Sequence, residues 1–296
     1  MKTIPDYRKF FGSFWDSASS GNLPKDQWAL KIYLQKEHNM RFPNASRMWA
    51  ETVVQKGSDY FLGVPDYSSI DGPQEGVDIN QAIRHAISEY NEYTPRDFDD
   101  GKDKEEFDAF REHLPDLIKT ATEGVKEYFS DVNQIEGEYQ ILYDEPKIDV
   151  PIMLYQDYSG GGKQIDLKCH LPLRNPPKKD GTRTWRVPKA YTEPRTNWIK
   201  QQAVYWKATK QKPALLSVTS NDYNIISEKN CELLSEDNLE IAYNQVVKSW
   251  EVSQNLLKAS RESWKNLASL IQPDMDEIAR LHGPQIVKIA KQLWEY

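Results

Sequence analysis

The chain has 296 residues and a formal net charge of −7, and 39% of its residues are hydrophobic, including 9 Trp and 16 Tyr. This composition is typical of a folded protein with a full hydrophobic core, formed as one large domain or as one domain with an appendage. No apolar run approaches the roughly 18 residues of a membrane span, and the first residues lack the apolar centre of a signal peptide. We therefore expect no membrane association.

Two cysteines, Cys169 and Cys231, are too few for a disulfide framework, a four-thiolate zinc site or an iron–sulfur cluster. We expect a protein of a reducing cytoplasm. The charge is unevenly distributed: residues 163–213 hold 13 Lys or Arg against 3 Asp or Glu, a local charge of +10 that leaves −17 elsewhere. Such a segment suits a polyanionic partner, although a solvated Lys-rich surface gives the same pattern.

The first half of the chain predicts helices. Residues 1–40 show no clear period, whereas residues 44–63 read as a helix capped near Asn44 or Ser46. Residues 78–93 read as a second helix, capped by Asp78 and carrying an apolar stripe from Ile79 to Tyr90. A third helix is expected within 104–129.

The second half predicts strands followed by helices. Strands are expected at 137–144, 148–158, 163–171, 213–220 and 223–227, with a helix at 197–211 and helical structure from about 236 onward. This order predicts an α/β fold with a helical cover. We expect a core unit over residues 1–235 and a C-terminal helical region over 236–296 that packs on it.

The strands at 148–158 and 163–171 carry the first candidate site. The "SGGG" at 159–162 predicts a tight turn, and pairing residue 158 with 163 puts Asp157, Asp166 and Lys168 on one face. In this register Asp157 is diagonal to Asp166, about 7–8 Å away at Cα. Two such carboxylates repel each other unless a cation lies between them, which favours a hard divalent ion such as Mg²⁺, with Mn²⁺ as a substitute.

Two alternatives weaken this hypothesis. The pattern Asp/Glu-x-Lys occurs three times in the chain, and an ordinary surface ion pair would explain Asp166 and Lys168 equally well. Asp149 lies on the same face as Asp157, but in this register it is about 20 Å along the strand from the partner of Asp166. We therefore favour Asp157 over Asp149 as the first acid.

The helix at 197–211 adds Gln201 and Tyr205, which are four residues apart and so share one helical face. The ordered set "VPIMLYQDY", "IDLKC", "QQAVY" and "PALLSVT" resembles the PD-(D/E)xK nucleases. Within that superfamily it is most similar to the RecB-like exonucleases common in phages, a group that includes Cas4 and mitochondrial genome maintenance exonuclease. The resemblance covers roughly residues 136–227.

The resemblance implies a restriction-endonuclease-like fold, a mixed central sheet flanked by helices with helical N- and C-terminal additions. It also implies hydrolysis of DNA phosphodiester bonds with a divalent metal. The implied catalytic residues are Asp157, Asp166, Lys168, Gln201 and Tyr205. The implied metal ligands are Asp157, Asp166 and the main-chain carbonyl of Leu167.

The chain departs from the family pattern at two places. Many members have a glycine where Leu154 stands, and many carry a metal-binding His on an upstream helix, for which His85 and Gln55 are the candidates here. The cysteine quartet that holds an iron–sulfur cluster in some relatives is absent, so no such cluster is expected.

The leading hypothesis is a metal-dependent DNA exonuclease of phage-type DNA replication, recombination or degradation, acting in the host cytoplasm if it is phage-encoded. The alternatives are a non-catalytic DNA-binding or assembly subunit and a structure-specific endonuclease on the same fold. Trp185 is expected either to stack on an unpaired base or to pack in the core. The residues expected to contact DNA phosphates are Arg174, Lys178, Lys179, Arg183 and Arg186.

Overall fold

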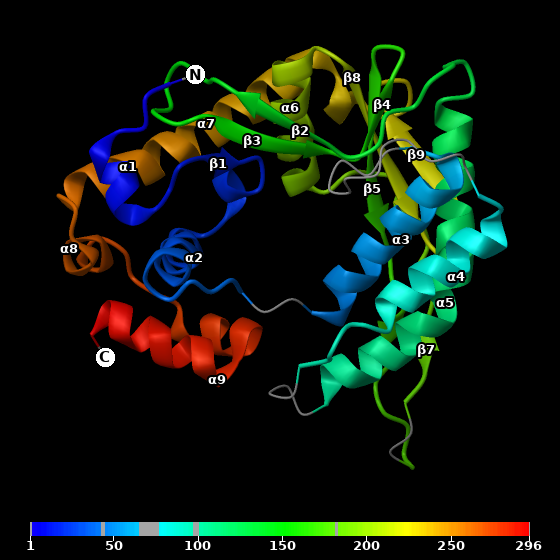
Figure 1. Ribbon diagram of the computed structural model, residues 1–296, viewed down its shortest axis with the longest axis horizontal. Coiled ribbons are helices and arrows are strands. Elements are labelled where there is room, and N and C mark those ends of the chain that lie inside the picture. Colours follow the sequence, from blue (N-terminus) through cyan, green and yellow to red (C-terminus); the bar gives the residue numbers. More distant parts are fainter. Residues whose placement is uncertain (1, 43–44, 65–76, 97–100, 181–182, 296) are drawn as a thin grey trace.

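The computed structural model describes residues 2–42, 45–64, 77–96, 101–180 and 183–295 (Figure 1). Its central element is a four-stranded mixed sheet with helices on both faces, which confirms the predicted α/β class. In this sheet β5 and β8 are parallel and the outer strands pair antiparallel to them. The strand order is β4 (Tyr158–Gly160), β5 (Lys163–Cys169), β8 (Lys212–Val218) and β9 (Tyr223–Ser227).

Helices cover the two faces of this sheet because alternate residues of its strands point to opposite sides. Ala214 and Leu216 of β8 join the hydrophobic cluster of one helix group, whereas Leu215 between them joins the cluster of the other group. The first group is α3 (Ser46–Leu62), α4 (Ile79–Tyr90) and α5 (Lys102–Tyr128); the second is α6 (Thr196–Thr209) and α7 (Glu236–Ala259).

Helix α5 lies unusually close to the sheet at Gly124. A Cβ atom at this position would come within 2.5 Å of Leu216 Cδ1, so only glycine allows this approach. The close contact fixes α5, and α3 packed against it, relative to β5 and β8.

A second sheet lies beside the first and is built on the same strand that leads into β4 (Figure 1). Its order is β1 (Asp16–Ser17), β3 (Ile152–Gln156) and β2 (Tyr139–Tyr143), with β1 parallel and β2 antiparallel to β3. The single strand predicted at 148–158 is therefore divided, because β3 pairs in one sheet, β4 pairs in the other, and Asp157 stands between them.

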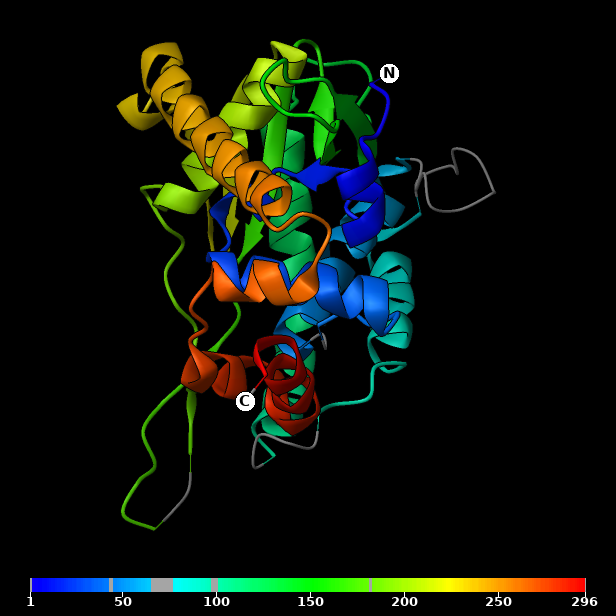
Figure 2. The same cartoon turned by 90° about the vertical axis from the view of Figure 1, so that its left-hand side faces the viewer.

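The N-terminal and C-terminal helices pack on each other, so segments far apart in sequence lie side by side (Figure 2). Phe11 and Trp28 share a cluster with Leu257 and Leu267. The helices concerned are α1 (Asp6–Phe11), α2 (Lys25–Glu37), the end of α7, α8 (Trp264–Ser269) and α9 (Met275–Trp294). Two one-turn helices, η1 (Ser20–Asn22) and η2 (Glu232–Leu234), precede α2 and α7. Among the described residues, no helix is both long and apolar enough to cross a membrane.

The expected helices of the first half are confirmed, with one difference at a cap. Asp78 caps α4 by accepting hydrogen bonds from the N–H groups of Asn80 and Gln81. Helix α3 begins at Ser46, whose N–H group donates to Asp103 Oδ1 at 2.8 Å. The acceptor for α3 is therefore supplied by α5, while Asn44 lies outside the described residues.

The turn between β4 and β5 corrects the predicted register. Tyr158 pairs with Ile165 and Gly160 with Lys163, so the turn consists of Gly161 and Gly162 alone. Both glycines have positive φ (55° and 76°), the signature of a type I′ hairpin turn, which matches strand twist better than the wider loop expected at 159–162. The register shifts by two residues, which leaves every side chain on its predicted face.

The two turn glycines are predicted to differ in their tolerance of alanine. Gly162→Ala should lower the free energy of unfolding by about 1–2 kcal/mol, because an L-residue at this φ is strained but its Cβ meets no neighbour. Gly161→Ala should cost more, because its Cβ would lie 2.7 Å from Val132 Cγ2. Urea unfolding measures both, and Val132→Ala should recover the difference in the Gly161→Ala background. Equal costs for the two glycine variants would contradict this account.

Candidate functional site

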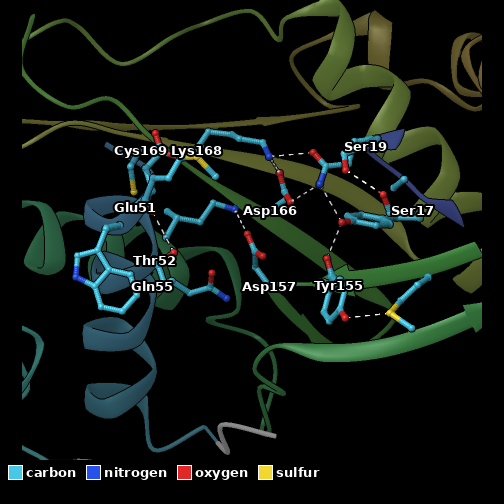
Figure 3. A pocket seen from close by; sticks show the side chains of 17 residues that line it. Ser17, Ser19, Glu51, Thr52, Gln55, Tyr155, Asp157, Asp166, Lys168 and Cys169 are labelled. Carbon is cyan, nitrogen blue, oxygen red and sulfur yellow. Dashed lines mark hydrogen bonds and ion pairs between the residues drawn. The ribbon is translucent and has the colours of Figure 1, made fainter. Parts of the chain in front are cut away.

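A cavity of about 440 Å³ opens where the chain passes from β3 of the second sheet to β4 of the central sheet (Figure 3). Its walls come from five parts of the chain: the β1 turn, α3, β3, β5 and α6. Asp157, Asp166, Lys168, Gln201 and Tyr205 all line it. The structure therefore brings together every side chain that the sequence predicted to be catalytic.

Asp157 occupies the break between β3 and β4. Its Oδ2 atom accepts a hydrogen bond of 2.7 Å from the backbone N–H of Leu167 on β5. The ladder between β4 and β5, continued by one residue, sets Asp157 opposite Asp166 instead of diagonal to it. The corrected register thus changes which residue faces Asp166, whereas the two acids line the same cavity as predicted.

Asp166 and Lys168 lie on β5 and form an ion pair at the bottom of the cavity. Asp166 is only 4% exposed, so its carboxylate reaches solvent only through the cavity. Burial alone would lower the pKa of Lys168, but the negative charges of Asp166 and Asp157 outweigh it and raise this pKa. Lys168 is therefore held as a cation beside Asp166, a poor general base but a good electrostatic partner for an anion.

A chain of hydrogen bonds connects Lys168 to α6 and β3. The ammonium group of Lys168 donates to Gln201 Oε1 at 3.0 Å, and Gln201 Nε2 lies 2.9 Å from the Tyr205 hydroxyl. The Tyr205 hydroxyl donates in turn to the main-chain carbonyl of Tyr155 at 2.6 Å. Gln201 and Tyr205 thus form a brace that fixes the position of Lys168.

The two carboxylates are electrostatically unfavourable in the protein alone. Burial and the neighbouring charge of Asp166 raise the pKa of Asp157 well above its usual range, and Lys168 compensates only in part. The negative charge of the two carboxylates is therefore not fully compensated by Lys168, so the pair would bind a further cation favourably.

Helix α3 contributes an acid that the sequence analysis missed. Glu51 and Gln55 both line the cavity from α3, and Figure 3 shows them on the side opposite Tyr155. Glu51 reaches solvent through the cavity mouth, yet desolvation by the surrounding protein raises its pKa, while Arg47 and Lys168 act in the opposite direction. The two residues are four apart on one helical face, which is the sequence signal that would have found Glu51 beside Gln55.

The other candidates lie elsewhere. The His85 imidazole is packed 3.9 Å from the Tyr60 ring and 3.1 Å from Glu89, outside the cavity lining, so Gln55 is the one of the two alternatives that reaches the site. Asp149 is bound by Lys258 at 2.7 Å and by the Tyr7 hydroxyl, on the side of α1 and α7. This placement agrees with the choice of Asp157 over Asp149.

The five residues expected to contact DNA do not line the cavity. They belong to the hairpin of β6 (Leu173–Arg174) and β7 (Trp185–Arg186), which projects from the body of the molecule (Figures 1 and 2). Arg174 forms an ion pair with Glu105, and Arg183 borders a depression lined by acidic residues of α5. Lys178, Lys179 and Arg186 are exposed.

Trp185, at the base of this hairpin, has a packing role. Its ring meets Phe110 of α5 edge to face at 6.0 Å and is half-buried. Of the two alternatives for this tryptophan, packing in the core is the one the structure supports.

The acidic pair fits a magnesium-type ion better than a metal cage made only of protein. Within the described ranges, no three His, Cys, Asp or Glu side chains are grouped closely enough to hold a metal ion on their own. Mg²⁺ commonly uses one or two protein carboxylates and fills its remaining positions with waters and substrate phosphates. Asp157 and Asp166 supply such a pair, and Leu167 lines the same cavity.

Comparisons of the chain with protein-family models, with curated proteins and with solved structures found no match.

The opposite electrostatics of Asp157 and Asp149 predict opposite effects on stability in metal-free protein. The folded state raises the pKa of Asp157, so it binds this proton more tightly than the unfolded state does. Stability therefore falls as the pH rises from about 4 through the raised pKa, by at most about 1.4 kcal/mol per pH unit. Asp157→Asn should remove this fall, as measured by urea unfolding in EDTA at several pH values.

Asp149→Asn is the matched control. Burial would raise the pKa of Asp149, but its hydrogen bonds from Lys258 and Tyr7 outweigh this and lower the pKa. Its contribution is present above the unfolded pKa and is lost as the pH falls through the folded pKa. Asp149→Asn should therefore destabilise the protein at neutral pH and lose that effect in acid. The same pH dependence in both variants would refute the assignment of the buried pair.

Proposed function

We propose that this chain is a divalent-metal-dependent DNA exonuclease built on a restriction-endonuclease-like core. One observation carries the proposal. Two carboxylates, a lysine and a Gln–Tyr brace, taken from three separate sequence segments, converge on a single cavity in the arrangement that the PD-(D/E)xK resemblance implies. A chance Asp-x-Lys pair on a surface would gain no such surroundings.

In this proposal the acidic side of the cavity holds the metal ion. Asp157 and Asp166, with the main-chain carbonyl of Leu167, are the proposed ligands, and Glu51 or Gln55 faces them from α3. Mg²⁺ in this position, or Mn²⁺ in its place, supplies Lewis-acid activation of a phosphodiester and of a water molecule.

The remaining residues are proposed to position the substrate and to stabilise charge on the reacting phosphate. Lys168 presents a fixed positive charge beside the carboxylates, where it offsets negative charge that develops on a phosphate and orients the attacking water. Gln201 accepts a hydrogen bond from Lys168, and Tyr205 fixes Gln201 against the backbone of β3. The β6–β7 hairpin is proposed to contact the phosphates of DNA outside the cavity.

Substitutions in β5 test catalysis. Asp166→Asn and Lys168→Ala should each reduce Mg²⁺-dependent release of nucleotides from end-labelled DNA by at least about 100-fold, because the first removes a proposed metal ligand and the second removes the positive charge beside the reacting phosphate. EDTA should abolish the activity of the unaltered protein. Lys163→Ala is the matched control, since Lys163 is also on β5 but pairs with Asp131 away from the cavity. Full activity of Asp166→Asn with an unchanged circular dichroism spectrum would sink the catalytic assignment.

Circular DNA separates the proposal from its alternatives. An exonuclease degrades linear DNA and leaves covalently closed circles intact, whereas a structure-specific endonuclease cuts circles that contain its preferred structure. A non-catalytic subunit binds DNA and cuts neither substrate. Linear and circular single-stranded and double-stranded DNA, incubated side by side with Mg²⁺, distinguish all three.

The hairpin makes a separate prediction about binding. If Lys178, Lys179 and Arg183 bind phosphates, replacing all three by alanine should flatten the dependence of log Kd on log salt by about 0.7–0.9 for each phosphate that is no longer neutralised. The affinity is measured by fluorescence anisotropy in Ca²⁺, over a series of salt concentrations. Lys207, Lys210 and Lys212 provide a triple-alanine control from the same basic segment. An unchanged slope in the hairpin variant would place the DNA elsewhere.

A further inference from the structure

The β1–β3–β2 sheet has one face that no helix in the described part of the chain covers and that leads into the cavity. Ser17 pairs with Met153, Met153 with Leu142, and Tyr155 with Gln140, so these five side chains share a face. The opposite face, with Ile152 and Leu154, is buried in the cluster shared with α6 and α7. Ser17, Met153 and Tyr155 also line the cavity, so the open face and the cavity form one surface.

This face is unusual because it exposes large apolar groups beside a site of buried charges. Tyr155 is 47% exposed and Leu142 is 44% exposed, whereas Met153 on the same face is buried. None of the five side chains is charged. An uncharged surface with an exposed ring suits the face of a nucleobase better than a phosphate backbone.

The Tyr155 ring is held in position without being covered. Its hydroxyl donates to the sulfur of Met153 at 2.9 Å, and Met153 accepts a second hydrogen bond from Gln140 at 3.0 Å. Its main-chain carbonyl is fixed by Tyr205. A ring fixed in this way loses little conformational freedom when a planar ligand stacks on it.

Tyr155 is also close enough to the two acids for a base stacked on its ring to place the adjacent phosphate beside them. It lies near the end of β3, two residues before Asp157 and about 7 Å away along the chain, and Figure 3 shows Asp157 between Tyr155 and Gln55. Asp166 lies at the cavity floor, between α3 and the β1 turn. A cavity of about 440 Å³ is the size of a small-molecule site, which suits a single nucleotide with its phosphate.

We propose that the open face of the β1–β3–β2 sheet binds an unpaired DNA strand, with one base stacked on Tyr155 so that the adjacent phosphate enters the cavity. This inference rests on the proposed nuclease function and adds its substrate class, a single-stranded end. Leu142 and Gln140 contact the next base along the strand, the first through apolar contact and the second through its amide.

Binding under non-cleaving conditions tests the platform. A labelled oligodeoxythymidine carrying one 2-aminopurine near its end is titrated with protein in Ca²⁺, and anisotropy and 2-aminopurine fluorescence are both recorded. Stacking on Tyr155 should quench the fluorescence. Tyr155→Ala should abolish the quenching and weaken binding about 5- to 150-fold, the range expected for loss of one base–aromatic stack.

Two variants serve as controls. Tyr155→Phe keeps the ring and should bind within about twofold of the unaltered protein, which separates stacking from the hydrogen bond to Met153. Ile241→Ala removes another exposed apolar side chain, on α7, and should change nothing. Circular dichroism of Tyr155→Ala shows whether the variant is folded, and Leu142→Ala, which should weaken binding by a smaller factor, tests the same surface if it is not.

The outcomes separate this inference from the proposed function. Metal-dependent cleavage with unchanged binding by Tyr155→Ala, or equal affinity of the unaltered protein for blunt duplex and single strand, overturns the platform and leaves the nuclease. Suppose instead that the unaltered protein cleaves no DNA with Mg²⁺ or Mn²⁺, but that Tyr155→Ala loses both the quenching and the affinity. This result would support the binding platform and overturn the proposed nuclease activity.

Discussion

The hydrogen bond from the Leu167 N–H group to the Asp157 carboxylate is the interaction on which the site depends. A strand that leaves a sheet normally leaves its neighbour with an unpaired backbone donor, which is costly when that donor is shielded from water. Here the side chain of Asp157 accepts the bond that the departing backbone no longer provides. The same residue thus ends the pairing between the strands, opens the cavity and points its carboxylate toward Asp166.

The second constraint is the brace that runs from Lys168 through Gln201 and Tyr205 to the carbonyl of Tyr155. It crosses from β5 to α6 and then to β3, so it joins both sheets around the cavity. The desolvation of Asp157 beside Asp166 costs stability, and a cation bound beside the two carboxylates would relieve that cost. The brace holds the Lys168 ammonium group in place beside Asp166.

The sequence predicted side-chain faces better than it predicted positions. Asp157, Asp166 and Lys168 share a face in any register that differs by an even number of residues, so their convergence survived an error of two. The register itself depends on the positive φ values of Gly161 and Gly162, and a run of three glycines does not reveal which two form the turn. Glu51 was missed because α3 meets β5 only through long-range packing. The break at Asp157 was missed because nothing in an apolar strand pattern marks where its pairing partner changes.

Local charge in the sequence was also an incomplete guide to electrostatic potential. Several cations of the +10 segment are paired with acids from outside it, including Lys163 with Asp131, Arg174 with Glu105 and Lys212 with Glu228. Each such pair weakens the attraction for a distant polyanion, because the charge of the acid cancels most of the field of the paired cation. Salt screens what remains beyond a Debye length of about 8–10 Å. At the hairpin, Arg174 and Arg183 lie against the acidic side of α5, so a DNA phosphate that binds them must compete with Glu105 and its neighbours. If the hairpin binds DNA as proposed, its affinity is the difference between these two ionic interactions, which favours loose and salt-sensitive binding outside the cavity.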